Sequence, residues 1–273
     1  MQHQTLQSWD SKVTSEESSK MTAGALQGMR VLDLSQVMAG PFSTMVLGDL
    51  GAEVIKVENP EAGDQSRRSW GNPGVGDDSR AFMSLNRNKQ SITLDLKVDA
   101  DRDAFYELVR TADVVIENWR PSVAERLGVG FDTLSAINPA LVYASISGFG
   151  HSGPYANRPG YDLIAQAMSG VMSVTGDPGG RPVKCAIPVA DLGAGLFCTV
   201  GILAAWTVSK ETGQGQRVET SLFDSALALS VWESTEYWAT GNAPKPLGSA
   251  NRMSAPYQAL ATSDGYVTVG ANN

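Results

Sequence analysis

The sequence predicts an α/β protein with a doubly wound, Rossmann-like and mostly parallel sheet, followed by the beginning of a second, smaller domain. Three observations lead to this prediction. Short apolar runs typical of buried strands alternate with segments of helical periodicity along most of the chain. The 273 residues, 42% hydrophobic and 18% charged, suffice for one large domain with a substantial core. Near the C-terminus, two strand-like runs flank Asp264-Gly265, a sequence typical of a hairpin turn.

The chain divides into four segments. Residues 1–27 are polar, lack the apolar core of a signal peptide, and are expected to be a disordered extension. Residues 28–222 are expected to form the large domain. A helix to about residue 238 and a loop then form a linker over 223–248, and residues 249–273 begin a small domain that is incomplete. In the large domain we expect strands at 29–35, 53–58, 91–96, 112–119, 141–149 and about 216–222, and helices at 41–50, 101–111, 121–127, 132–138 and from about 161 and 191.

The first strand, helix and second strand form a β-α-β unit that ends in Glu58. An acidic residue at this position is typical of dinucleotide-binding domains. However, Gly40 is the only glycine between the first strand and its helix, and no G-x-G-x-x-G pattern is present there. Binding of NAD is therefore the less favoured alternative.

Asp191 is the only charged residue between positions 184 and 210, and it lies where a long helix, apolar around most of its circumference, is expected to begin. We expect this helix to be buried. One interpretation makes Asp191 the N-cap of the helix. The other makes it a carboxylate nucleophile, kept ionised by the helix N-terminus, with Gly193 and Gly195 letting a substrate come close. The stretch by itself favours the N-cap, although the two roles are compatible.

Composition excludes several classes of function. The formal net charge of −8 argues against a general nucleic-acid-binding protein. No apolar run reaches about 18 residues without small or polar interruptions, so we expect no membrane span. Cys185 and Cys198 lie in apolar surroundings, which indicates a reduced, cytoplasmic protein. With two histidines in the chain, we expect no metal site, and we interpret His151 as an ordinary loop residue.

Basic residues gather in two loops that precede the third strand. Arg67 and Arg68 lie in the Gly- and Pro-rich segment 59–79, and Arg87 and Lys89 follow it. Such clusters usually form a solvated surface, but they can also hold phosphates through charge-assisted hydrogen bonds. These residues alone favour the solvated surface.

Read together, several stretches resemble the family III CoA-transferases, the group of the formyl-CoA, carnitine and succinyl-CoA–glutarate enzymes. The matching stretches are VLDLSQVMAGPFSTMVLGDLGAEVIKVENP, SLNRNKQSITLDLK, ADVVIENWRPSVAERLG, NPALVYASISGFGHSGP, GYDLIAQAMSG and IPVADLGAGL. They run almost unbroken from residue 29 onward in the order of the family. The pattern is most similar to that of the succinyl-CoA–glutarate and formyl-CoA branch, which implies a small carboxylic acid, such as a dicarboxylate, as acceptor.

The resemblance implies a role for Asp191 as the catalytic aspartate, which attacks an acyl-CoA, forms an anhydride and then carries CoA as a thioester. Backbone donors at the helix start are expected to stabilise the oxyanions. CoA is then a substrate, no other cofactor is bound, and the family's homodimer of interlinked chains is expected. The resemblance further implies that substrate or CoA contacts come from Gln36, Met38, Ala39, Asn59, Asn86, Arg87, Lys89, Asn118, Trp119, Arg126, Tyr161 and Asp162.

Departures from the family pattern bear on specificity and class. Met38 stands where the formyl-CoA enzyme has glutamine, which argues against formate or oxalate, and Asn59 replaces an arginine that contacts CoA there. A 2-methylacyl-CoA racemase is an alternative, but its histidine position is Tyr161, whose ordinary pKa of about 10 suits proton transfer poorly. A non-catalytic CoA-binding fragment is the other alternative. Because family members continue beyond residue 273, we expect this chain alone to fold poorly or to associate through exposed core, with little activity.

Overall fold

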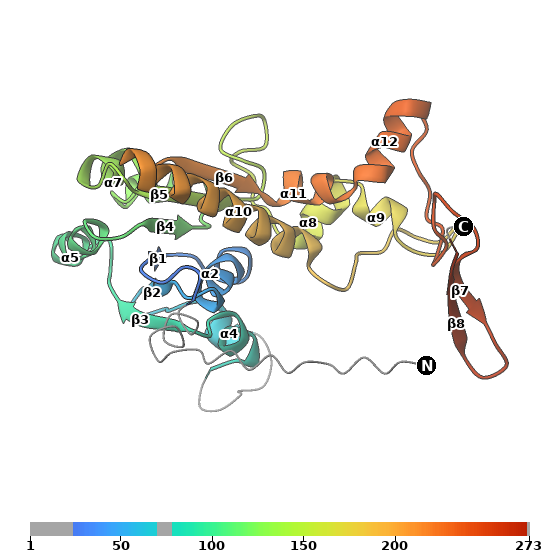
Figure 1. Ribbon diagram of the computed structural model, residues 1–273, viewed down its shortest axis with the longest axis horizontal. Coiled ribbons are helices and arrows are strands. Elements are labelled where there is room, and N and C mark those ends of the chain that lie inside the picture. The colour runs from blue at the N-terminus through green and yellow to red at the C-terminus, as the bar shows by residue number, and fades with distance from the viewer. Residues whose placement is uncertain (1–23, 70–77, 272–273) are drawn as a thin grey trace, which may run out of the picture.

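A computed structural model describes residues 24–69 and 78–271 of the chain. Most of the expected disordered extension, residues 1–23, lies outside the described residues, and the boundaries of the four segments stay predictions. Within the described ranges, six parallel strands form one sheet in the order β3-β2-β1-β4-β5-β6 (Figure 1). This confirms the doubly wound, Rossmann-like fold, because the strand order reverses between β1 and β4. The strands are β1 (Arg30–Asp33), β2 (Glu53–Glu58), β3 (Lys89–Thr93), β4 (Val114–Glu117), β5 (Val142–Ser147) and β6 (Arg217–Ser221).

The helices mostly follow the expected segments, with a few differences. The segment 59–79 was expected to be a surface loop, but a helical turn, α3, lies in it, and α4 follows. The single helix expected to extend to about residue 238 is interrupted at Ser230, which separates α11 from α12. The helices are α2 (Ala39–Asp49), α3 (Ser66–Ser69), α4 (Arg80–Leu85), α5 (Asp99–Val109), α6 (Val123–Arg126), α7 (Phe131–Ile137), α8 (Asp162–Met168), α9 (Val171–Val174), α10 (Val189–Thr212), α11 (Leu222–Leu229) and α12 (Val231–Thr240).

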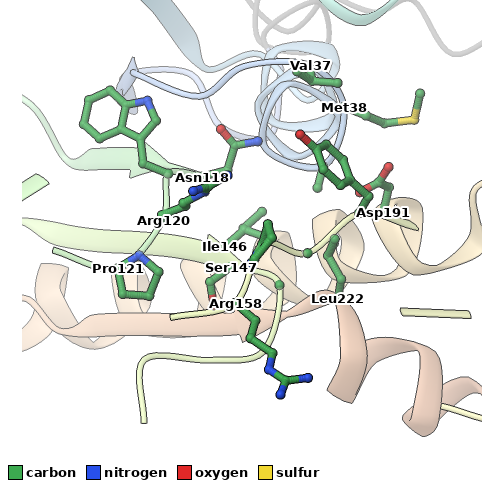
Figure 2. Close-up of a pocket in the computed structure, with 16 residues that line it drawn as sticks. Val37, Met38, Asn118, Arg120, Pro121, Ile146, Ser147, Arg158, Asp191 and Leu222 are labelled. Atoms are coloured by element: carbon green, nitrogen blue, oxygen red, sulfur yellow. The ribbon is translucent and has the colours of Figure 1, made fainter. Parts of the chain in front are cut away.

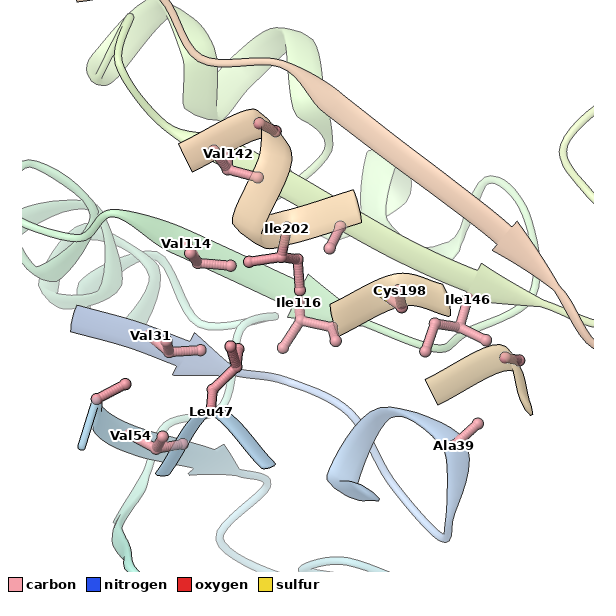
Figure 3. Close-up of a cluster of buried hydrophobic side chains, with 14 of the residues drawn as sticks. Val31, Ala39, Leu47, Val54, Val114, Ile116, Val142, Ile146, Cys198 and Ile202 are labelled. Atoms are coloured by element: carbon pink, nitrogen blue, oxygen red, sulfur yellow. The ribbon is translucent and has the colours of Figure 1, made fainter. Parts of the chain in front are cut away.

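Both faces of the sheet are covered, so its strands carry apolar residues at consecutive positions. On β1, Val31 belongs to the cluster under α2 and α10, whereas Leu32 belongs to the cluster under α5, α6 and α7. Figure 3 shows the first cluster, in which Ile202 of α10 and Leu47 of α2 lie over the central strands. The two clusters hold the carboxyl ends of β1, β4 and β5 in one rigid edge.

Helix α10 buries mainly small residues, and several of its large apolar residues are exposed. Ala190, Ala194 and Ile202 are fully buried, whereas the exposed fractions of Leu196 and Val200 are 49% and 64%. The expectation that the whole helix is buried is therefore wrong. The small residues face the core because α10 packs closely against α2, α11, β5 and β6. Among the described helices, only α10 is long and apolar enough to cross a membrane. The core helix of a globular domain meets the same criteria of length and composition.

The last strands form a separate antiparallel pair, β7 (Tyr257–Ala261) and β8 (Tyr266–Gly270). This confirms the hairpin expected around Asp264-Gly265. Figure 1 shows the pair beyond α12, away from the six-stranded sheet.

Candidate active site

A cavity of about 190 Å³ lies at the carboxyl ends of β1, β4 and β5, where the strand order reverses. In open α/β sheets this is the position at which ligands bind. Figure 2 shows Asp191 and Met38 at one end of the cavity, and Asn118 and Pro121 toward the other. The lining residues are Val37, Met38, Ala39, Asn118, Trp119, Arg120, Pro121, Ile146, Ser147, Gly148, Arg158, Pro159, Gly160, Tyr161, Asp191 and Leu222.

Asp191 is the third residue of α10 and does not cap it. The N-cap position is occupied by Pro188, so the N-cap interpretation is wrong. The Asp162 side chain instead serves this helix end, because its Oδ1 accepts hydrogen bonds from the backbone N–H of Ala190 (2.9 Å) and of Asp191 (3.4 Å). Gln166 holds Asp162 in place, with Nε2 at 2.7 Å from Oδ2.

The remaining backbone donors at the start of α10 are also satisfied. The N–H of Val189 donates to the Ile187 carbonyl at 2.8 Å, and that of Leu192 donates to the Pro188 carbonyl at 3.0 Å. The expectation that this helix end stabilises oxyanions is therefore wrong, because none of its first four N–H groups is free.

The surroundings of Asp191 favour its neutral form. Burial, together with the negative charge of Asp162, raises the pKa of Asp191 from 3.8 to about 7. Among the described residues no cation forms an ion pair with Asp191. The helix N-terminus thus does not keep Asp191 fully ionised, contrary to expectation, and near neutral pH both protonation states are populated.

The two glycines after Asp191 serve helix packing, so the expectation that they open space for a substrate is wrong. A methyl group on Gly195 would lie 2.7 Å from the carbonyl oxygen of Ala39 and 2.9 Å from Cδ1 of Phe42, both on α2. A methyl group on Gly193 would meet Cδ1 of Leu229 on α11 at 2.9 Å. These glycines set how closely α2 and α11 approach α10.

The start of α2 supplies the backbone donors that α10 lacks. In the described ranges, no side chain caps α2, and the N–H groups of Ala39 and Gly40 have no hydrogen-bond acceptor. Ala39 lines the same cavity as Asp191. Gly40 is required there, since a Cβ would lie 2.2 Å from Cβ of Ser35. A helix N-terminus with free N–H groups attracts negative charge.

The loop between β1 and α2 is held in a strained conformation. Val37 has φ +69°, in the left-handed region, which costs a β-branched residue about 1–3 kcal/mol. The Asn118 amide fixes the preceding residue through two hydrogen bonds, accepting from Gln36 N at 2.8 Å and donating to Gln36 O at 2.7 Å. Asn118 therefore positions a cavity wall as well as lining it.

A second cavity of about 170 Å³ continues along the same sheet edge. Trp119 lines both cavities, and Gln36 and Asn59 line the second. The Asn59 side chain also orders the following turn by accepting hydrogen bonds from the N–H of Glu61 (3.0 Å) and Ala62 (3.1 Å). The expected contacts at Gln36, Asn59, Asn118 and Trp119 thus line two cavities that share Trp119.

The basic candidates lie outside both cavities. The Lys89 side chain is 2% exposed, and its Nζ lies 3.0 Å from Asp33 Oδ2 and donates to Asn86 Oδ1 at 2.8 Å. Although burial by itself would raise the pKa of Asp33, Lys56 and Lys89 hold it well below its ordinary value. Arg87 pairs with Asp49 on the surface.

Of three further candidates, one lines the first cavity and two do not. Tyr161 lines the first cavity and is 69% exposed, whereas Asp162 contacts the backbone of α10 instead of lining the cavity. Arg126 is exposed, and its Nη1 lies 3.2 Å from Ser122 Oγ. Asp191 and Tyr161 are thus brought together at the first cavity, and Arg126 is not.

Sequence reasoning missed Asp64 and the role of Arg120. Asp64 is 1% exposed although it lies in a Gly- and Pro-rich segment whose composition indicates a surface loop. Arg120 lines the first cavity, and no ion pair holds it within the described ranges. Its position directly after the fourth strand is the one signal the sequence offered.

Comparison with known proteins gives a consistent match over nearly the whole chain. The model of the family described as CoA-transferase family III matches residues 26–273. The succinyl-CoA:glutarate CoA-transferase of Mus musculus is 43% identical over 248 residues, which are 91% of this chain and 57% of that protein. The acetyl-CoA:oxalate CoA-transferase of Acetobacter aceti is 45% identical over 242 residues, 88% of this chain and 62% of that protein.

A solved structure agrees with these matches. The crystal structure of a CAIB/BAIF family protein from Brucella suis superposes with a TM-score of 0.84 at 42% identity, over 90% of this chain and 65% of that one. The chain spans about three fifths of the length of the curated relatives it matches.

Proposed function

The chain belongs to CoA-transferase family III, and on that premise we propose that it transfers CoA from an acyl-CoA thioester to a carboxylic acid, with Asp191 as the nucleophile. The observation that carries this proposal is the Asp191 carboxylate on a cavity that Ala39 at the start of α2 also lines. Among the described residues, this carboxylate has no cationic partner and the N–H groups of Ala39 and Gly40 have no acceptor. A carboxylate suits this chemistry because it can form first an anhydride and then a thioester without a separate base.

In the first half of the proposed reaction, a carboxylate oxygen of Asp191 attacks the thioester carbonyl carbon of the donor. The C–S bond breaks, CoA leaves as a thiolate, and a mixed anhydride remains on Asp191. The thiolate then attacks the Asp191 carbonyl carbon, which releases the donor acid and leaves an aspartyl-CoA thioester. The acceptor carboxylate repeats these steps in reverse. The N–H groups of Ala39 and Gly40 are the donors we assign to the transient oxyanions.

We further propose that the acceptor is a dicarboxylic acid. Relatives named for glutarate and oxalate support an acceptor of this class. Arg120 supports it independently, because it lines the cavity and forms no ion pair with any described residue, which leaves its guanidinium suited to a second carboxylate. Cytoplasmic location and a homodimer also belong to this proposal. Support for them comes from the free thiols of Cys185 and Cys198 and from the exposed apolar face of α10.

The test is to incubate the protein with a panel of acyl-CoA donors and mono- and dicarboxylic acids, oxalate included, and to identify products by mass. Arg120→Gln should raise the KM of the acceptor acid by roughly tenfold and leave the KM of the acyl-CoA almost unchanged, because it removes one charge-assisted contact. A rise in the KM of acyl-CoA instead would assign Arg120 to a CoA phosphate. No acyl-CoA product with any acid would contradict the proposed transfer.

A further inference from the structure

One wall of the first cavity is formed by the loop between β1 and α2. Its central residue, Val37, has φ +69° and lines the cavity. A β-branched residue rarely adopts this conformation, so it persists only where surrounding contacts hold it. The contacts around Val37 therefore identify the residues that shape this wall.

Three consecutive residues of the loop are each held from a different part of the fold. Lys56 of β2 donates from Nζ to the carbonyl of Ser35 at 2.7 Å. The Asn118 amide holds Gln36 through two hydrogen bonds. Asp64 Oδ1 accepts the N–H of Val37 itself at 3.2 Å.

Asp64 is well placed to be the determining contact. Its carboxylate is 1% exposed, and Oδ1 is further fixed by the N–H (2.8 Å) and the hydroxyl (2.7 Å) of Ser66. Its Oδ2 lies 3.0 Å from Lys56 Nζ, an ionic contact without hydrogen-bond geometry. Lys56 and Asp64, which contact each other, thus hold Ser35 and Val37 as one unit.

The backbone conformation of Val37 determines the direction in which the chain continues into α2. Met38 comes next, and the free N–H groups of Ala39 and Gly40 come directly after it at the start of α2. We propose that Asp64 is a positioning residue for the transfer reaction: by holding Val37 in the left-handed conformation, it fixes these N–H groups at the cavity that contains Asp191. This inference rests on the proposed function.

The test compares the full-length protein with Asp64→Ala, Val37→Gly and the double variant. Asp64→Ala should lower kcat on the order of 10- to 100-fold while the KM of acyl-CoA changes little, because misplaced groups affect the transition state more than binding. Val37→Gly in the Asp64→Ala background should restore kcat about tenfold, because glycine adopts a positive φ without strain. Glycine at position 37 cannot replace the countercharge of Lys56, so a purely structural role of Asp64 predicts no such rescue.

Asp64→Asn separates the hydrogen bond from the charge, because asparagine keeps an acceptor for the N–H of Val37. Its kcat should exceed that of Asp64→Ala by about tenfold. Equal losses in the two folded variants, or a double variant no faster than Asp64→Ala, would overturn the inference. If Asp64→Ala does not fold, a double variant that folds and turns over supports the inference, and one that also fails to fold contradicts it.

Thermal melting of the same four proteins separates this inference from the proposed function. Val37→Gly should raise the Tm less in the Asp64→Ala background than in the parent, whatever reaction the protein catalyses, because a valine freed from the contact with Asp64 has less strain for glycine to relieve. If the effects of the two substitutions on Tm are coupled in this way but the parent protein transfers no CoA, the proposed function is refuted and the contact between Asp64 and Val37 is established. A parent that transfers CoA with Asp64→Ala at full kcat would refute the positioning role alone.

Discussion

Replacing Asp191 by asparagine should abolish CoA transfer and also stabilise the folded chain above neutral pH. Asparagine has no carboxylate to form the anhydride, yet it has nearly the same size. The stabilisation follows from the surroundings of the carboxylate, which is buried beside Asp162 and has a pKa of about 7 instead of 3.8. Ionising it in the folded state therefore costs on the order of 4 kcal/mol more than in the unfolded chain, at about 1.4 kcal/mol for each pKa unit.

The direction of the expected change in stability follows from the titration of Asp191 in the folded and the unfolded chain. Between pH 3.8 and about 7 the folded chain holds the proton of Asp191 and the unfolded chain has lost it. The folded state binds more protons there, so the free energy of unfolding falls as pH rises through this window. The asparagine side chain does not titrate, so the Asp191→Asn variant gains stability relative to the parent over the same window, by about 2–3 kcal/mol between pH 5 and pH 8.

The measurement is urea unfolding of parent and variant at pH 5 and pH 8, together with a transfer assay and a CoA-binding assay at pH 8. Asp132→Asn is the matched control, because Asp132 is exposed in the first turn of α7. A stability difference that is the same at both pH values would show that Asp191 is not destabilised by its surroundings. Transfer by the asparagine variant at the parent rate would refute the nucleophile assignment.

Three further outcomes follow from the site. The kcat/KM for acyl-CoA should rise about tenfold per pH unit below pH 7 and level off above it, because ionised Asp191 is the reacting form, and a flat profile would contradict this. Gly195→Ala should destabilise the chain by about 1–3 kcal/mol in thermal or urea unfolding, since the methyl group meets the backbone of α2, whereas Gly193→Ala meets only the flexible end of Leu229 and should cost less. With Tyr161 in the histidine position of the racemases, a 2-methylacyl-CoA should not exchange its α-proton in deuterated water, and catalytic deuterium uptake would favour the racemase instead.

The sheet and its order of elements were predictable because each strand carries its own signal. Pairs such as Val31 and Leu32 are apolar at consecutive positions, a pattern that arises where helices cover both faces of a sheet. The exposed face of α10 was not predictable in this way. A helix that is apolar all round contains no information about which side faces the core, and here the choice depends on how closely α2 and α11 approach its small residues.

The residues of the candidate site also differ in whether the sequence could predict them. Asp191 and the residues at the strand ends could be predicted, because their positions follow from the order of elements. Asp64 could not, since a buried carboxylate in a Gly- and Pro-rich segment depends on Lys56, a partner on a neighbouring strand. The pKa of Asp191 was likewise not predictable, because it depends first on burial in the folded chain and then on the charge of Asp162, 29 residues earlier in the chain.

The close contact between α2 and α10 has a consequence for the size of acid that the cavity admits. Gly195 lies about 6 Å along the helix axis from Asp191, at a rise of about 1.5 Å per residue. There it touches Ala39, which with Asp191 borders the cavity. The width of the cavity beside Asp191 therefore depends on the spacing of α2 and α10. For the proposed transfer, a wider acid would be admitted by widening the contact between α2 and α10 at Gly195, a residue outside the cavity lining.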